Sequence, residues 1–119
     1  MKKLLYIGFL LFFISCKSDA ELAIERGVYL YDWGKVDEAI LEFNKAKYLQ
    51  IAKKTQSYDD LKLLAQTHYN LSIAYAKLGI YKIAYQEAQH AVSLIPNQEY
   101  REVLDLISHK IIELQPAQN

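Results

Sequence analysis

Cysteine, proline and glycine are all scarce in this chain of 119 residues, and each shortage excludes a class of structure. The only cysteine, Cys16, cannot form a disulfide within the chain, so packing alone must hold the fold together. Two prolines and four glycines are too few for a fold built from many turns. Because the segments after Ser18 are rich in helix-forming residues, the composition predicts an all-α domain.

An excess of charge of either sign is also lacking. The chain carries 14 basic and 14 acidic side chains, and the basic ones form no block. Affinity for nucleic acid depends on clustered lysines and arginines that neutralise phosphates. We therefore expect no nucleic acid among the partners of this protein.

The first fifteen residues differ in composition from the rest. Lys2 and Lys3 precede an apolar run over residues 4–14, an order that is typical of a secretory signal peptide. The run is too short to cross a bilayer comfortably as a helix, which takes about 20 apolar residues. We expect the leader, residues 1–15, to be removed. The remaining chain then has 12 basic and 14 acidic side chains, a net charge of about −2.

The end of the leader, Phe13-Ile14-Ser15-Cys16, resembles the lipobox of bacterial lipoproteins. In that family the cysteine is lipidated on its sulfur and becomes the first residue, although Phe13 stands where leucine is usual. The resemblance implies a lipid on Cys16 and a short tether over residues 16–19. The alternative is ordinary cleavage after Ala20, which would discard Cys16. A lone cysteine at the boundary between the apolar and polar segments favours lipidation.

A lipid anchor implies attachment to a membrane of the bacterial cell envelope. Two acyl chains or more are needed to hold a protein stably, since one chain binds only marginally. Lys17 and Ser18 do not resemble the aspartate that retains enterobacterial lipoproteins at the inner membrane. We therefore expect the outer membrane, with the periplasmic and surface sides both open.

The remainder of the chain, residues 20–114, contains a repeat. Segment 34–40 recurs as segment 79–85, and Gly34 and Gly79 are each expected to end a helix in the left-handed conformation. Alanines follow each glycine at matching distances: Ala39 and Ala46 in the first copy, Ala84 and Ala91 in the second. Gly27 and Ser72 also correspond. Small residues at these spacings let two helices cross closely.

These positions resemble the tetratricopeptide repeat, a helix-turn-helix unit of about 34 residues. The resemblance implies a short right-handed solenoid of helical hairpins with about two repeats, at residues 20–53 and 65–98. His68 and Ala88 depart from the tryptophan and the bulky aromatic residue of the family pattern. The first copy matches the pattern more loosely than the second.

The two copies are unevenly spaced, because Gly34 and Gly79 are 45 residues apart. We place the extra length in an extension of the hairpin, residues 50–64. A turn in this extension is expected to end at an aspartate that caps a helix starting at Leu61.

One more helix is expected after the second copy, over residues 98–114, with Asn97 as its cap. Its apolar residues recur at helical spacing, but Leu106 stands where the repeat needs a small side chain. Arrays of repeats need terminal units that cover the open end of their core. This helix is therefore expected to cap the array, followed by a tail over residues 115–119.

Motifs that carry chemistry are missing from the sequence. The three histidines, His68, His90 and His109, have no histidine or cysteine one helical turn away, so we expect no metal site. His68 is expected to pack in the core. No phosphate-binding loop or nucleophile motif occurs. We expect neither a cofactor nor an enzyme.

In tetratricopeptide proteins the first helix of each pair lines a concave groove. The resemblance maps ten residues to this groove, Glu21 and Gln66 among them, and six are predicted to bind a partner: Ile24, Val28, Tyr31, Tyr69, Ile73 and Lys77. The family's carboxylate clamp needs lysine and asparagine, but apolar residues and a tyrosine stand at those places here, which excludes a clamp. An apolar groove suits a helix or an extended segment of another protein. The alternative is that Tyr100 or its neighbours in the last helix fill the groove.

The sequence thus predicts a lipid-anchored, non-catalytic adaptor that binds a protein partner in the cell envelope. Two alternatives stay open at this point. The groove could carry an apolar small molecule as an accessory of solute uptake, or the protein could be an adhesive lipoprotein displayed on the cell surface.

Overall fold

The computed structural model describes residues 16–116, and within that range the chain is all-α, as predicted. Five helices follow one another: α2 (Asp19–Asp32), α3 (Val36–Ile51), α4 (Tyr58–Lys77), α5 (Tyr81–Leu94) and α6 (Gln98–Leu114). The predicted leader, residues 1–15, and residues 117–119 of the predicted tail lie outside the described residues.

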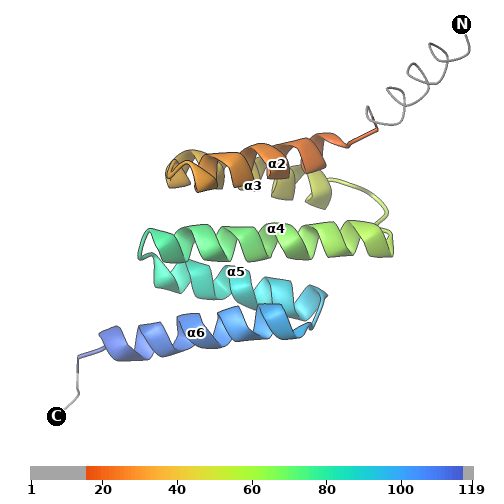
Figure 1. Ribbon diagram of the computed structural model, residues 1–119. Helices are drawn as coiled ribbons and strands as arrows, with labels where there is room; N and C mark the ends of the chain where they lie inside the picture. Colours follow the sequence, from red (N-terminus) through yellow and green to blue (C-terminus); the bar gives the residue numbers. More distant parts are fainter. Residues whose placement is uncertain (1–15, 117–119) are drawn as a thin grey trace, which may run out of the picture.

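The helices run alternately back and forth through one stack (Figure 1). Each helix packs on the next one along the chain, most extensively within the pairs α2 with α3 and α4 with α5. Consequently α2, α4 and α6 all begin at the same side of the stack (Figure 1). This arrangement brings the first turns of three separate helices to one end of the molecule.

In each pair, the two helices are joined by a turn of the same kind, built on a glycine. Gly34 and Gly79 have φ angles of 82° and 78°, which an L side chain adopts only at a cost. In each turn the amide after the glycine donates to a carbonyl five residues earlier: Lys35 to Leu30 at 2.8 Å and Ile80 to Tyr75 at 2.9 Å. This hydrogen bond closes the preceding helix and reverses the chain. The left-handed conformation predicted for both glycines is confirmed.

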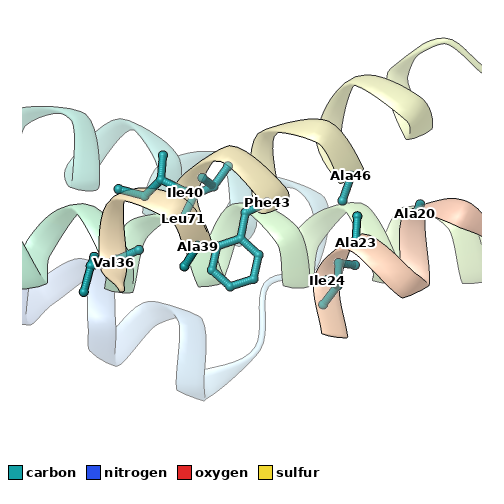
Figure 2. Close-up of a cluster of buried hydrophobic side chains, with 10 residues drawn as sticks. Ala20, Ala23, Ile24, Val36, Ala39, Ile40, Phe43, Ala46 and Leu71 are labelled. Carbon is teal, nitrogen blue, oxygen red and sulfur yellow. The ribbon is translucent and has the colours of Figure 1, made fainter. Parts of the chain in front are cut away.

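Within the first pair, α2 crosses α3 at Gly27. A Cβ atom added to Gly27 would lie 2.4 Å from Cε1 of Phe43, so the crossing has no room for a side chain. The phenylalanine ring is 2% exposed, and Ala39 and Ala46 are fully buried on the same helix. Figure 2 shows these side chains together with Leu71, which joins the cluster from α4.

The second pair repeats the backbone of the first but fills its interior differently. Ala84 and Ala91 are fully buried, as their counterparts in α3 are. Ser72 and Ala88, however, stand where the first pair has glycine and phenylalanine. Ala88 and Ala84 pack with Ile107 from α6, so the last helix completes this second cluster.

Helix α4 begins earlier than the sequence predicted. Ser57 caps it: its hydroxyl accepts from the Asp60 amide at 3.2 Å, and the Asp60 carboxylate accepts from the Ser57 amide at 2.9 Å. The predicted aspartate cap before Leu61 is therefore wrong, because Asp60 is the second partner of a capping box and not the cap itself. Only residues 52–57 lie outside helices between α3 and α4.

The last helix agrees with the prediction in its bounds and in its cap. Asn97 precedes α6 and its side-chain oxygen accepts from the Tyr100 amide at 2.9 Å. In the first helix of the stack, Ser18 and Glu21 form a second capping box at the start of α2. The sequence analysis had not identified this box, although Ser18 and Glu21 have the required spacing.

Candidate functional site

A hollow of about 590 Å³ lies at the side of the stack where α2, α4 and α6 begin. Its wall draws on α2, α3, α4 and α6, including Glu21, Leu49, Gln50, Leu63, Gln66 and Tyr100. Three helix starts and the end of α3 thus converge on one concave surface. Glu21 and Gln66 stand at repeat positions that the resemblance assigned to the groove.

The charges around this hollow are mixed, with an excess of acid. Lys53 forms an ion pair with Asp60 at 2.7 Å, and together with the Ser57 amide it lowers the pKa of Asp60 to about 2. Apart from this pair, the lining includes three further acidic side chains and one basic one: Asp19, Glu21, Asp59 and Lys62. The hollow therefore favours groups that carry positive charge.

Gln50 leaves a polar atom unsatisfied at the wall of the hollow. Its side chain is almost fully buried, and its amide nitrogen donates to the Thr67 hydroxyl at 3.1 Å. The amide oxygen of Gln50 is buried without a hydrogen-bond partner among residues 16–116. An unpaired buried acceptor costs about 1–3 kcal/mol, so the position of Gln50 is held at some cost in stability.

The three groove residues predicted on α4 lie on the same face of that helix as the α4 residues that line the hollow. Lys62 and Gln66 line the hollow, and Tyr69, Ile73 and Lys77 follow at spacings of three or four residues, which places them on the same helix face. Ile73 is partly exposed and Lys77 is exposed. On this face of α4, Ile73 and Lys77 lie beyond the lining of the hollow, toward the glycine turn.

Tyr69 is held by the last helix. Its ring centroid lies 4.8 Å from that of Tyr100, and its hydroxyl donates to the Glu99 carboxylate at 3.0 Å. Burial, followed by the hydrogen bond to Glu99, raises the pKa of Tyr69, so its hydroxyl stays protonated and keeps donating. At this position α6 covers the predicted groove, as the alternative reading of the sequence held.

The three groove residues predicted on α2 differ in exposure. Val28 exposes 41% of its surface, and Tyr31 is half-buried against the first core cluster. Ile24 exposes only 5% and belongs to that cluster. Ile24 therefore acts in packing and offers a partner almost no surface.

A cluster of ionisable side chains links α3, α4 and α5. His68 Nδ1 lies 2.5 Å from one carboxylate oxygen of Glu87, and Lys47 Nζ lies 3.4 Å from the other. His68 and Glu87 are both buried, while the exposed His90 places its ring 5.0 Å from that of His68. The expectation that His68 packs in the core is confirmed, but it does so as a hydrogen-bonded group.

Burial alone would raise the pKa of Glu87, but its neighbours reverse that effect. The hydrogen bond with His68, then the charge of Lys47, hold the Glu87 pKa below its ordinary value of 4.5. The carboxylate stays charged and ties three helices together. Sequence analysis missed Glu87, although it falls between Ala84 and Ala91 on the buried stripe of α5, where helical spacing could have identified it.

Within residues 16–116, no group of three His, Cys, Asp or Glu side chains is placed to hold a metal ion. No helix of this range is long and apolar enough to span a membrane.

Comparison of the chain with models of protein families and with curated proteins found no match.

We expect Glu87→Gln to lower the free energy of unfolding at pH 7 by about 1.5–3 kcal/mol, the range for hydrogen bonds to charged groups. Because the folded-state pKa lies below 4.5, Glu87 contributes stability that is present above that pH and is lost as the pH falls through the lowered pKa. The difference in stability between wild type and variant should therefore shrink as the pH drops from about 6 toward about 3. Urea unfolding measures this difference.

Glu42→Gln is the matched control, since Glu42 pairs with Arg26 at 3.1 Å near the surface. The same substitution there should cost less than about 1 kcal/mol. If the two variants lose equal stability, or if the effect of Glu87→Gln does not change with pH, the cluster does not hold the helices together as described.

Proposed function

We propose that this protein is a lipid-anchored, non-catalytic adaptor that binds a segment of another cell-envelope protein. One observation carries the proposal: a hollow with an excess of acidic side chains lies where α2, α4 and α6 begin, and farther along the same face of α4 the side chain of Ile73 is partly exposed. A concave surface of this kind, with charged side chains around it and an apolar residue nearby, suits a segment of another protein.

The array itself is proposed to be a tetratricopeptide-like solenoid of two repeats, with α6 as its cap. The support lies in the two glycine turns of equal geometry and in the alanines buried at matching positions of both pairs. In such an array the first helices of the pairs, α2 and α4, supply the binding face. Val28 and Ile73 are the partly exposed apolar residues on these two helices that the sequence assigned to the groove.

The hollow argues against an apolar cargo. Its volume of about 590 Å³ would suit a small molecule. Its lining, however, carries the charged side chains of Asp19, Glu21, Asp59 and Lys62, which an apolar molecule would have to desolvate. A peptide with basic and apolar side chains would offset part of that cost by pairing its charges with the acidic side chains.

The proposed anchor rests on the lipobox-like segment and on the position of Cys16. The residue is exposed and lies just ahead of the capped start of α2. A lipid on Cys16 would therefore hold the array close to the membrane, with little free chain between them.

Cys16→Ala should abolish the anchor, because it removes the sulfur that receives the lipid. After metabolic labelling with a fatty acid, the variant should carry no label, and detergent phase separation should move it to the aqueous phase or show uncleaved precursor. Lys17 is exposed and follows Cys16 directly, so Lys17→Ala is the control and should leave labelling and partition as in wild type. Equal labelling of wild type and Cys16→Ala would exclude the lipoprotein assignment.

A photo-crosslinking amino acid at Val28 or Ile73 should trap one discrete partner in living cells, because both side chains lie on the proposed binding face. The same amino acid at Leu41, which is 70% exposed on α3, is the control and should trap nothing specific. Ile73→Asp should remove the crosslink from Val28, since a charge there opposes burial of an apolar segment.

Circular dichroism of Ile73→Asp has to match wild type for this loss to count. A crosslink that forms equally from Leu41, or that survives Ile73→Asp in the folded protein, would place the partner on another surface.

A further inference from the structure

A stripe of large side chains on the outer face of α2 has no helix against it among the described residues. Trp33 is 75% exposed, Tyr29 is 66% exposed, and Leu22 and Arg26 lie on the same face at spacings of three or four residues. We call Leu22, Arg26, Tyr29 and Trp33 the α2 outer stripe. It carries two aromatic rings, one aliphatic side chain and one cation, and the acidic side chains of Asp19 and Glu25 flank it on the helix.

The repeat explains why this face is bare. Three of its residues correspond, 45 positions later, to Thr67, Leu71 and Ala74, which are fully buried. Leu71 and Ala74 pack in the cluster built on α3, and Thr67 bonds Gln50 of α3. The same face that α4 uses to pack on the preceding helix is therefore left open on α2.

The side chains on the two faces differ in a way that identifies what covers the open one. On α4 the buried face is made of small and aliphatic residues, which let a helix approach to about 8–10 Å. On α2 the corresponding residues include tyrosine and arginine, with tryptophan beyond them, which would hold a neighbouring helix away. Tryptophan, tyrosine and arginine are instead the residues that settle at the boundary between lipid headgroups and acyl chains.

The position of the stripe relative to Cys16 supplies the second argument. Only Lys17 and Ser18 separate Cys16 from Asp19, the first residue of α2, and three peptide units span at most about 11 Å. A lipid on Cys16 would thus place the start of α2 at the bilayer surface. Arg26 bonds Glu42 through Nε, and its other N–H groups can reach a headgroup phosphate.

We infer that the α2 outer stripe lies on the membrane surface, so that α2 runs parallel to the bilayer and the array stands with α6 farthest from it. This inference rests on the proposed lipid anchor. Helix α2 is about 21 Å long, so Trp33 reaches the headgroups only if the helix lies flat. If the array stood on its helix starts instead, Trp33 would remain in water.

Trp33 is the only tryptophan of the chain, so its fluorescence reports this contact directly. Protein expressed from the full sequence in a bacterium is purified and reconstituted into phosphatidylcholine vesicles, and mass spectrometry reads whether Cys16 carries lipid. We expect the emission of Trp33 to shift to shorter wavelength. We also expect lipids brominated near the top of their acyl chains to quench it.

The matched control moves the tryptophan to the far end of the array, with Trp33→Phe and Leu106→Trp. Leu106 is 68% exposed on α6, so the new side chain would be about as exposed as Trp33 is now. Its emission should be neither shifted nor quenched by the vesicles. Tyr29→Ser with Leu22→Ser should weaken quenching of Trp33 while leaving the lipid on Cys16 intact.

Each other result decides against the inference in a distinguishable way. Lipidated, vesicle-bound protein whose Trp33 is not quenched would overturn the flat orientation and leave the anchor standing. A shift that depends on protein concentration without vesicles would assign the stripe to a second copy of the chain. A Cys16 without lipid would overturn the proposed function, and the inference with it.

Discussion

The contact between Gly27 and Phe43 is the constraint on which the rest of the structure depends. With no side chain at Gly27, the ring of Phe43 lies directly against the α2 backbone and closes the first core cluster. That cluster also takes in Leu71 from α4, so the second pair is positioned by the first. A wider crossing would move α2 away from α4, and the hollow at their starts would lose its shape.

The two outermost helices of the stack, α2 and α6, have different surroundings, and the proposed function depends on this difference. At one end α6 covers the second pair through Ile107 and covers Tyr69 through Tyr100 and Glu99. At the other end, the outer face of α2, the helix that follows the proposed lipid anchor, carries aromatic side chains. Between these ends, the face of α2 and α4 that carries Val28 and Ile73 is the one proposed to bind a partner. A membrane-bound array of this kind would present its groove sideways, within reach of proteins that project from the same bilayer.

The sequence predicted most of the backbone, because glycine turns and small-residue spacings depend on local geometry. Gly34 and Gly79 take the predicted conformation, and α6 has the predicted bounds. The start of α4 was misplaced because two adjacent aspartates obscured the capping box that Ser57 forms. The side-chain site was harder to predict. The burial of Ile24, the cover over Tyr69 and the partners of Glu87 depend on contacts between helices distant in sequence, and periodicity within one helix does not contain them.

The most direct measurement of the central claim is a double-mutant cycle of Gly27→Ala and Phe43→Leu, followed by thermal unfolding. Alanine would stabilise an exposed helix by about 1 kcal/mol relative to glycine, whereas overpacking costs about 1–3 kcal/mol. The account predicts that Gly27→Ala lowers the melting temperature, by about 4–8 °C for each kcal/mol lost, and that Phe43→Leu relieves part of that loss in the double variant. A rise in melting temperature for Gly27→Ala alone, or strictly additive effects, would contradict it.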